Sequence, residues 1–399
     1  MKLVVVIVSY NVRHYLEQCL MSLRRALDGI DAQICVADNH SKDSTVEALR
    51  PLFPDVRFVA GNHNLGFARA NNIILRQTES DFVLLLNPDT VVAEDCIRQS
   101  LAFMEAHPAA GALGVKMHNT TGRPAKESRR GVPSPLVAFY KMSGLCARYP
   151  QSRRFGKYYM GYLPWNEPAQ IEVVSGAYCL LRRAAINKVG LLDEDFFMYG
   201  EDIDLSYRLL KGGFENWYLP QRILHYKGES TTKSSFRYVH VFYGAMLIFF
   251  RKHYAHFSLL VSLPVKAAIC VRASLALLGT LKKKMLRSMG FLTRSNRSAD
   301  VFHFIGGAEM IERCRKAAAD NAWTASFCTA DEQSQPDGHL AQQYDTNNRT
   351  THFMVYDTSA YSYERIMQLF EQRPQDNLKM AFYHPENHTV ITEKDILFV

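Results

Sequence analysis

Two adjacent acids, Glu201 and Asp202, stand at the start of a segment with helical spacing, and His225 follows an apolar run further along the chain. Another apolar run ends in Asn87 and Asp89. A positioned carboxylate can take a proton from a hydroxyl group. A carboxylate together with an imidazole can hold Mg²⁺ or Mn²⁺, and such a cation neutralises the charge of a diphosphate leaving group. These residue types indicate transfer of a group from a diphosphate.

The first 115 residues alternate short β-branched runs with longer amphipathic stretches. Such alternation predicts parallel βαβ units, an α/β fold with helices on both faces of a sheet, and ligands at the carboxyl ends of the strands. The expected strands are residues 4–8, 33–37, 56–60 and 82–86, and the expected helices are 12–26, 45–49 and 68–76.

Polar residues follow three of these expected strands at once. Ser9, Tyr10 and Asn11 follow the first strand, Asp38 follows the second, and Asn87-Pro88-Asp89 follows the fourth. We therefore expect these side chains to share one edge of the sheet.

Regular patterning is weak in residues 119–170, which we interpret as a long excursion that carries substrate loops. It returns at residues 171–181. A helix over 203–211 then ends at a Gly-Gly pair, and residues 217–219 and 223–225 predict two short strands.

The length of 399 residues predicts two or three folding units. A composition of 47% hydrophobic and 22% charged residues is typical of a globular chain. The formal net charge of +8 suits an anionic partner. Eight dispersed cysteines form no metal or disulfide pattern and are expected to be reduced. The apolar start is too short for a signal peptide, so we expect a buried strand and a cytoplasmic catalytic part.

Residues 238–280 are apolar and helical in pattern, and residues 257–280 approach the length of a bilayer span. Pro264, Lys266 and Arg272 interrupt that stretch, which favours a helix lying in the membrane plane. The Lys- and Arg-rich run up to residue 297 suits anionic lipid headgroups. The alternative is a helix pair docked on the catalytic domain. We expect no nucleic-acid partner, because the basic run lacks interleaved aromatic residues.

Residues 298–399 again alternate strands and helices and predict a small α/β unit of unknown role. Its expected strands are 301–305, 324–328, 353–356 and 378–383, and its expected helices are 309–319 and 363–370.

Six segments taken together resemble family 2 glycosyltransferases, which are inverting enzymes of the GT-A fold, and among them bacterial rhamnosyltransferases of surface-polysaccharide synthesis. The segments are VSYN at 8–11, ADNHSKDST at 37–45, NLGFARANN at 64–72, LLLNPDT at 84–90, VSGA at 174–177 and FFMYGEDIDLSYR at 196–208. The resemblance covers about residues 1–235 and implies a Rossmann-like, mostly parallel sheet.

The resemblance implies a nucleotide-sugar donor, linked to dTDP or UDP, held at the strand ends. Asp38 would bind the nucleobase or ribose, with an Asx turn or an N-cap of the helix that follows as the alternative role. Arg69 would meet the diphosphate, and loop or cap roles remain open for the asparagines. The donor-binding residues are then Ser9, Tyr10, Asn11, Asp38, Asn64, Gly66, Arg69, Asn72, Asn87, Asp89, Ser175 and Gly176.

The metal site implied by the resemblance contains Asp89 and His225 and holds Mg²⁺ or Mn²⁺. The family form is Asp-x-Asp, whereas this chain has Asn87 in place of the first acid. An amide oxygen is a weaker ligand than a carboxylate, so we expect Asp89 to coordinate the cation and Asn87 to donate a hydrogen bond.

The family's Glu-Asp motif places the general base at Asp202, with Glu201 supporting it electrostatically or binding the acceptor. Asp204 is expected to cap the helix or to pair with Arg208 one turn later. An alternative for the acidic pair is a favourable interaction with the helix dipole, and both roles can hold together.

These residues and the resemblance predict an inverting glycosyltransferase domain over residues 1–237, a membrane-association segment over 238–297 and an α/β domain over 298–399. The acceptor would be a lipid-linked or growing glycan, reached peripherally at the inner face of a bacterial plasma membrane. The alternative is a catalytically weak, nucleotide-sugar-binding scaffold protein, which Asn87 favours.

Overall fold

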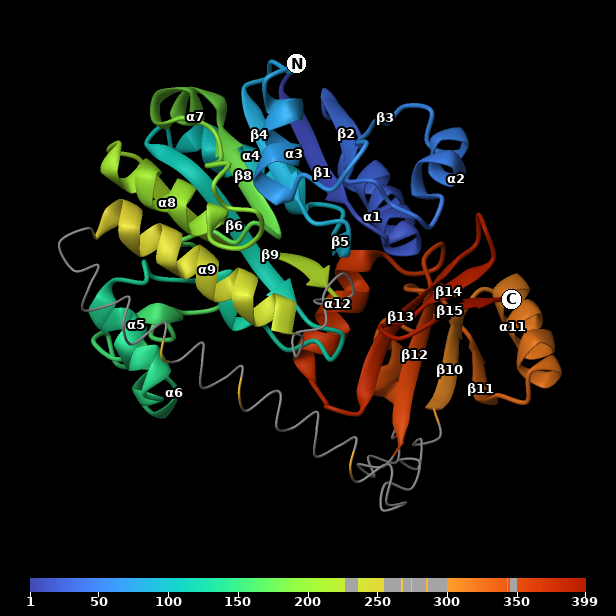
Figure 1. Cartoon of the computed structure of the whole chain (residues 1–399). Coiled ribbons are helices and arrows are strands. Elements are labelled where there is room, and N and C mark those ends of the chain that lie inside the picture. The colour runs from blue at the N-terminus through green and yellow to red at the C-terminus, as the bar shows by residue number, and fades with distance from the viewer. Residues whose placement is uncertain are drawn as a thin grey trace.

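A computed structural model describes residues 1–226, 236–254, 300–342, 344 and 350–399, besides the single positions 267, 274 and 285. Its described strands form a nine-stranded sheet and a six-stranded sheet, each flanked by helices (Figure 1). The expected α/β class with a second, smaller α/β unit is confirmed.

The parallel part of the large sheet has the order β3-β2-β1-β4. Every residue of the central strand β1 is buried, as its continuous apolar run predicts. The strands are β1 (Leu3–Ser9), β2 (Ala32–Asp38), β3 (Arg57–Ala60) and β4 (Phe82–Leu86), and the helices between them are α1 (Arg13–Ala26), α2 (Thr45–Leu52) and α3 (Phe67–Leu75). The expected βαβ alternation is confirmed, with small shifts at the ends.

The rest of the sheet is mixed, because β8 runs antiparallel to both β4 and β6. These strands are β5 (Thr90–Val92), β6 (Ala110–His118), β7 (Ala169–Ile171), β8 (Tyr178–Arg182) and β9 (Glu215–His225). The prediction of two strands at 217–219 and 223–225 is wrong, since β9 continues through Pro220. Strand β6 escaped prediction because two glycines and Lys116 interrupt its apolar pattern, although Lys116 is fully buried.

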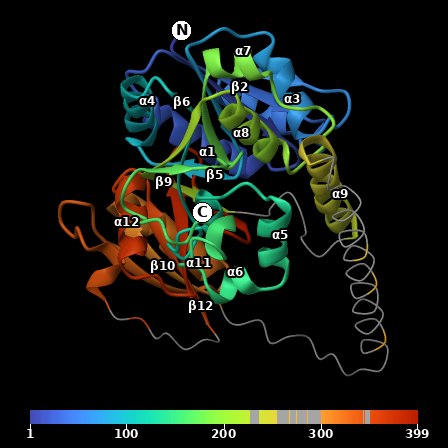
Figure 2. The same cartoon turned by 90° about the vertical axis from the view of Figure 1, so that its left-hand side faces the viewer.

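The two faces of the large sheet carry separate apolar cores. One core includes residues of α1 and α4 (Cys96–Ala106), and the other includes residues of α3, α7 (Arg183–Val189) and α8 (Glu201–Lys211). Figure 2 shows α3, α7 and α8 together on one side. Because helices cover both faces of the sheet, both sides of its strands are buried, and the strands therefore consist of apolar runs.

The excursion between β6 and β7 is more regular than its sequence suggests. It contains α5 (Pro135–Met142), α6 (Leu145–Arg148) and the 3-10 turns η1 (Lys126–Ser128) and η2 (Gly156–Tyr158). Ser134 caps α5 by accepting a hydrogen bond from the Val137 N–H, and Pro135 occupies its first turn. The sequence analysis did not predict α5, because the helix is short.

The C-terminal unit has the strand order β11-β10-β12-β13-β14-β15. The strands are β10 (Asp300–Gly306), β11 (Thr324–Thr329), β12 (Thr351–Asp357), β13 (Leu378–His384), β14 (Thr389–Ile391) and β15 (Ile396–Phe398), and the helices are α11 (Ala308–Asp320), α12 (Tyr363–Gln372) and η4 (Gly338–Ala341). The four expected strands and two expected helices are all present, and β14 and β15 extend the sheet by two antiparallel strands.

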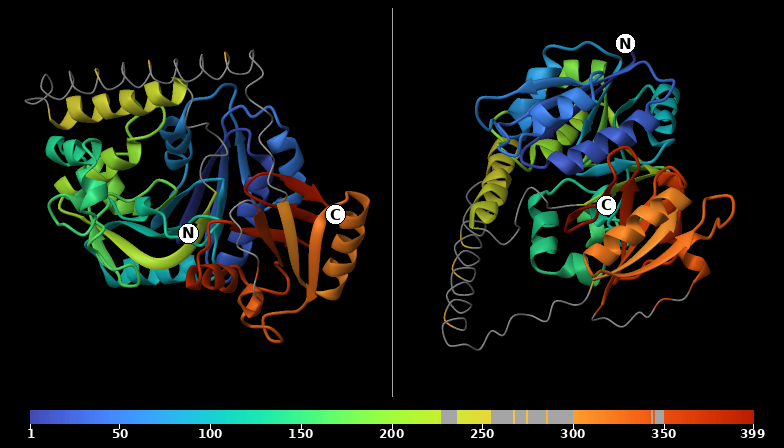
Figure 3. Two further views of the ribbon diagram at one scale, coloured as in Figure 1. Left: turned by 90° about the horizontal axis from the view of Figure 1, so that it is seen from below. Right: turned by 90° about the vertical axis from the view of Figure 1, so that its right-hand side faces the viewer.

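This unit packs directly against the first (Figure 3), and buried residues of both units form one apolar cluster. Glu371 on α12 binds Lys116 of β6 at 2.7 Å and Arg222 of β9 at 2.7 Å. Lys116 Nζ is almost completely buried, so its charge requires this partner. The boundary at 298 stays a prediction.

The segment that we expect at the membrane is only partly described. Helix α9 (Phe236–His253) confirms helical structure at its start. Residues 257–280 and the basic run that follows lie outside the described residues, except for three single positions. No helix in the described part of the chain is both long and apolar enough to cross a bilayer.

Candidate active site

The carboxyl ends of β1, β2 and β4 lie side by side, as the sequence predicts. Ser9 is in register with Asp38, and Ile7 is in register with Leu86, so that Asn87 follows at the same edge. Strand β5 pairs antiparallel with β9, with Thr90 opposite His225. This pairing brings the histidine to the polar segment that ends β4.

A cavity of about 320 Å³ opens at this edge. It is lined by residues from the strand ends, the loop before α3, the excursion after β6 and the start of α8. The predicted residues among them are Tyr10, Asn64, Gly66, Asn87, Asp89, Ser175, Gly176, Glu201, Asp202 and His225. Segments far apart in the sequence therefore share one cleft, although the structure does not test their individual roles.

Asp89 and His225 lie in direct contact at the cleft. His225 Nε2 lies 3.3 Å from Asp89 Oδ1 and 3.4 Å from the amide nitrogen of Asn87. Both acid and histidine are largely buried, and the backbone N–H of Tyr226 donates to the Asp89 carbonyl at 3.0 Å. The pairing of β5 with β9 thus fixes the separation of the two side chains.

This oxygen and nitrogen pair suits Mn²⁺, and Mg²⁺ is bound in other proteins by one or two carboxylates together with substrate phosphates. The described residues contain no group of three or more His, Cys, Asp and Glu arranged to hold a metal ion. The side chains present therefore fit a cation that takes its remaining ligands from a diphosphate.

Asp202 is held by a guanidinium and two backbone N–H groups. Arg130 forms an ion pair with its Oδ2 atom, which also accepts from the Gly176 N–H at 3.2 Å. Its Oδ1 atom accepts from the Ile203 N–H at 2.8 Å. Asp202 lies in the first turn of α8, where the helix dipole favours an anion. The carboxylate is consequently fixed in orientation at the wall of the cavity.

Glu201 sits in a different environment from its neighbour. Its side chain is buried, and one of its carboxyl oxygens has no hydrogen-bond partner. Burial, and then the charge of Asp202, raise the pKa of Glu201 to about 8. Glu201 is therefore protonated at neutral pH and adds no second carboxylate charge beside the ion pair of Arg130 with Asp202.

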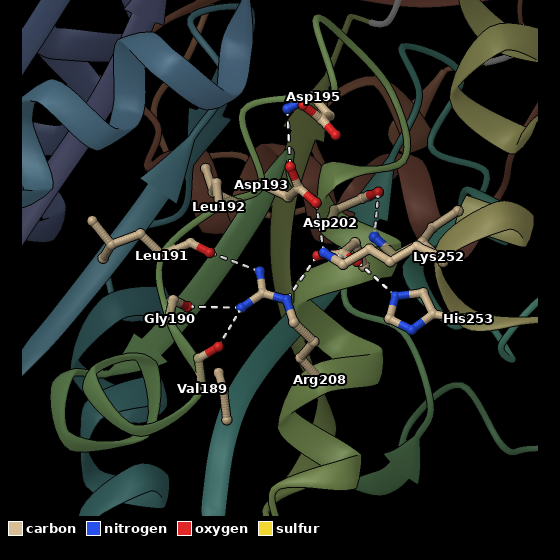
Figure 4. Close-up of polar contacts among 12 residues, drawn as sticks. Val189, Gly190, Leu191, Leu192, Asp193, Asp195, Asp202, Arg208, Lys252 and His253 are labelled. Atoms are coloured by element: carbon tan, nitrogen blue, oxygen red, sulfur yellow. Dashed lines mark hydrogen bonds and ion pairs between the residues drawn. The ribbon is translucent and has the colours of Figure 1, made fainter. Parts of the chain in front are cut away.

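Helix α8 is anchored by a charged cluster around Asp204. Figure 4 shows Arg208, Lys252 and His253 of this cluster. Arg208 Nε binds Asp204 at 2.7 Å, which confirms the expected pairing one turn apart. The same guanidinium donates to the carbonyls of residues 189–191 at 2.7–2.9 Å. From α9, Lys252 and His253 reach the other Asp204 oxygen at 2.9 and 2.7 Å. Burial would raise the pKa of Asp204, but the hydrogen bonds from His253 and Lys252 and the charge of Arg208 outweigh it, and the pKa is lowered.

The loop before α3 approaches the acidic segment closely. Gly66 has φ of +80°, and a Cβ atom there would collide with the carbonyl of Phe197. Asn64 accepts from the Gly66 N–H at 2.9 Å, and Asn39 donates to the Gly66 carbonyl at 3.0 Å. Gly66 is thus required for the contact between the loop and the segment that leads into α8.

Five predicted donor residues lie outside the cavity lining. Asp38 accepts from the N–H and hydroxyl of Ser41, three residues on, at 2.9 and 2.6 Å, whereas an Asx turn would use the N–H two residues on. Asn11 accepts from the Lys42 N–H at 2.7 Å, and Ser9 is fully buried. The structure does not test their donor roles.

The other two of these residues, Arg69 and Asn72, contact Glu194. Asn72 donates to Glu194 at 2.9 Å and to the Leu192 carbonyl at 2.8 Å, and Arg69 lies 3.8 Å from Glu194. These contacts tie α3 to the segment before α8. Donor binding by either residue stays a prediction.

The cavity residues that the sequence did not predict include Arg130, Glu127, Asn119 and Tyr199. The adjacent Arg129-Arg130 pair in a Gly- and Pro-rich stretch was an available signal, because buried arginines need acidic partners. Tyr199 has φ of +68° directly before Gly200, so the turn into α8 is strained. No local pattern announces that strain.

Residues 4–190 match the family described as Glycosyl transferase family 2. The chain carries a family 2 glycosyltransferase domain. The resemblance proposed from the six segments is confirmed at the level of the family, and so is the class of enzyme.

Two similar proteins are rhamnosyltransferases. N-acetylglucosaminyl-diphospho-decaprenol L-rhamnosyltransferase of Mycobacterium tuberculosis is 29% identical over 299 residues, which cover 68% of this chain and 93% of that protein. Rhamnosyltransferase WbbL of Escherichia coli is 23% identical over 257 residues, which cover 59% of this chain and 91% of that protein.

Solved structures are similar at lower identity. Mannosyltransferase PcManGT from Pyrobaculum calidifontis, in complex with GDP-Man and Mn²⁺, is 16% identical with a TM-score of 0.43, over 72% of this chain and 79% of that one. TarS of S. aureus, residues 1–349, is 18% identical with a TM-score of 0.40, over 62% of this chain and 64% of that one.

Proposed function

We propose that this protein is an inverting, metal-dependent glycosyltransferase that moves rhamnose or another hexose from a dTDP- or UDP-linked donor to a lipid-linked or growing glycan. The observation that carries the proposal is that Asp89, His225 and Asp202 line one cavity. The two relatives described above act as rhamnosyltransferases by name, and one acts on a diphospho-decaprenol acceptor. The setting would be cell-surface glycan synthesis at the inner face of a plasma membrane.

Donor binding would use the strand ends and the loop before α3. Tyr10 is partly exposed at the cavity and offers a ring on which a nucleobase can stack. Asn64 and Gly66 present backbone close to the bound diphosphate. Asp89 and His225 would hold Mg²⁺ or Mn²⁺, and the cation, when bound, neutralises the diphosphate as it leaves.

Asp202 would act as the general base. Inversion in a single displacement requires a carboxylate that takes the acceptor hydroxyl's proton as the hydroxyl attacks the anomeric carbon. The two backbone N–H groups and Arg130 hold Asp202 in one orientation. Because its pKa is raised, Glu201 is protonated at neutral pH. It therefore places no second negative charge beside the base, and it can donate a hydrogen bond to an acceptor hydroxyl.

Arg130 would act as a positioning residue in this scheme. Its guanidinium occupies the Asp202 oxygen that also meets Gly176. An acceptor that carries phosphate offers the guanidinium a competing anion, because arginine binds phosphate and carboxylate in similar geometry.

A donor panel tests the proposal. The purified full chain is incubated with Mn²⁺ and each of several dTDP-, UDP- and GDP-sugars, with and without a diphospholipid acceptor, and products are identified by mass spectrometry. We expect one sugar to be transferred, with release of the matching nucleoside diphosphate. Absence of transfer with every donor would remove the proposal.

The alternative function is that of a nucleotide-sugar-binding scaffold. Asn87 in place of an acid favours it, since the cation then has one carboxylate fewer. Donor binding without transfer or hydrolysis in the same panel would support this alternative.

A further inference from the structure

The α5–α6 hairpin exposes a group of large apolar side chains. Leu136 and Phe139 on α5 are 56% and 59% exposed, Met142 at its end is 49% exposed, and Tyr149 after α6 is 46% exposed. We call these four residues the α5–α6 patch. Single exposed apolar residues are ordinary, but a group of them on one short hairpin marks an interaction surface.

Three of the four patch residues lie on one face of α5. Leu136, Phe139 and Met142 recur at every third position, whereas Val137 and Ala138 between them are buried. Ala138 joins an apolar cluster with residues of α9, including Phe249 and Phe250. The inner face of α5 is therefore packed, and the outer face is exposed. Figures 1 and 2 show α5 and α6 projecting beside α9 at the edge of the molecule.

The charged residues in the surrounding sequence are all basic. Residues 128–166 contain no Asp or Glu, and the seven cations among them are Arg129, Arg130, Lys141, Arg148, Arg153, Arg154 and Lys157. Arg148, Arg153 and Arg154 are exposed near the patch, and Arg154 Nε donates to the Tyr140 hydroxyl of α5 at 3.2 Å. Cations around protruding apolar side chains complement a surface that is negatively charged outside and apolar beneath.

The patch is also connected to the cleft. The same excursion from the sheet supplies Glu127 and Arg130 to the cavity wall before it continues into α5. A surface bound by α5 and α6 would thus lie at the side of the cleft that contains Arg130 and Asp202, where the acceptor enters in the proposed function.

We propose that the α5–α6 patch is a docking surface for an anionic lipid bilayer, with Leu136 and Phe139 inserted below the headgroups and the exposed arginines between phosphates. A bilayer is favoured over a protein partner because the exposed charged residues of the hairpin, Arg148, Arg153 and Arg154, are all cations. This surface is distinct from residues 257–297. Its value to the enzyme rests on the proposed function, in which the acceptor is lipid-linked, but its test requires no catalysis.

The test measures partition of the full chain onto vesicles by co-sedimentation. The vesicles contain phosphatidylcholine alone or phosphatidylcholine with phosphatidylglycerol. The paired variant Leu136→Ser/Phe139→Ser removes the apolar contacts, and Arg148→Gln/Arg153→Gln removes two cations. The matched control is Leu52→Ser on α2, since Leu52 is 51% exposed and lies on a different part of the domain.

We expect binding to the anionic vesicles only. The paired apolar variant should lower the partition coefficient roughly tenfold or more, because each buried side chain contributes to insertion. The arginine pair should lower it roughly tenfold as well, with a loss that disappears at high salt. Leu52→Ser should bind as the parent chain does.

Three results would overturn the proposal. The first is equal binding by the paired apolar variant and the Leu52→Ser control, which would leave membrane contact to other residues. The second is no vesicle binding by the parent chain. The third is loss of a dimer on gel filtration by the paired variant without any change in vesicle binding, which would assign the patch to a second copy of the chain.

Unchanged far-UV circular dichroism verifies that each variant is folded. The three readouts do not depend on transfer, so they stay informative even if the donor panel fails.

Discussion

Arg130 and Asp202 form an ion pair at the wall of the cleft, and both side chains are largely buried. The carboxylate proposed as the base is therefore neutralised by a residue that lies 72 positions earlier in the chain. Gly176 and Ile203 complete its hydrogen bonds, so Asp202 is oriented before any acceptor arrives. The cleft combines a fixed base with a cation that an anionic acceptor can attract.

Arg130→Gln should leave Asp202 without its charged partner. A hydrogen bond to a charged group contributes roughly 1.5–3 kcal/mol, so the free energy of unfolding should fall by about that amount. Transfer should also fall, because the base is no longer held in place. Urea unfolding and initial rates measure both effects. Arg50→Gln, which removes an exposed arginine on α2, is the control and should change neither; equal behaviour of the two variants would argue against a role for Arg130.

The raised pKa of Glu201 predicts how the free energy of unfolding depends on pH. Its pKa is raised in the folded state, to about 8, above the ordinary value of about 4.3 in the unfolded chain. The folded state therefore holds the proton more tightly, and the stability from this group is fully present below about pH 4 and is lost as pH rises through about 8. Glu201→Gln should remove that loss. Unfolding free energies of both chains at several pH values test this, and parallel profiles would contradict it.

Asp204 should be a structural acid rather than a catalytic one. Its pKa is lowered, so its contribution to stability is present above the unfolded value of about 3.9 and disappears as pH falls through the folded value. Asp204→Asn should cost roughly 3 kcal/mol, because Arg208, Lys252 and His253 lose a buried partner.

The matched control for Asp204 is Glu309→Gln, which breaks another Arg pair one turn apart on a helix, at an exposed position. That pair should contribute less than about 1 kcal/mol. Thermal and urea unfolding at neutral pH distinguish the two. Equal losses for the buried and exposed pairs would refute the role assigned to the Asp204 cluster.

The metal proposal predicts that chelation by EDTA removes transfer and that Mn²⁺ restores it. His225→Gln should raise the Mn²⁺ concentration for half-maximal activity at least about tenfold, since imidazole nitrogen is the better ligand. His240→Gln on α9, an exposed position, serves as the control. Full activity in EDTA, or an unchanged Mn²⁺ requirement in His225→Gln, would exclude a cation held by Asp89 and His225.

The sequence predicted the edge of the sheet well because that information is local. Apolar runs ending in Ser9, Asp38 and Asn87 identify strand ends, and parallel strands bring those ends together. Asp89 and His225 were foreseen as a pair only through the family resemblance, because nothing local indicates that β5 pairs with β9.

Contacts between distant segments were not predictable from pattern. Arg130 and Asp202 meet across 72 residues, and Lys116 and Glu371 meet across 255. Each is a charge whose partner comes from another element, and periodicity reports only whether a position is buried. Lys116 is one reason why strand β6 was not predicted, because a buried lysine is rare unless it is paired.

The most direct test of the central claim compares transfer by the parent chain and by Asp202→Asn, with the nucleotide sugar identified by the donor panel and Mn²⁺ present. Asparagine preserves the shape of the side chain but cannot take the proton. Asp195→Asn, an exposed acid on the preceding loop, is the control. We predict a loss of at least about 100-fold in the transfer rate for Asp202→Asn, with donor binding retained by calorimetry and the control unaffected. Transfer by Asp202→Asn at the parent rate would contradict the assignment of the base and the mechanism built on it.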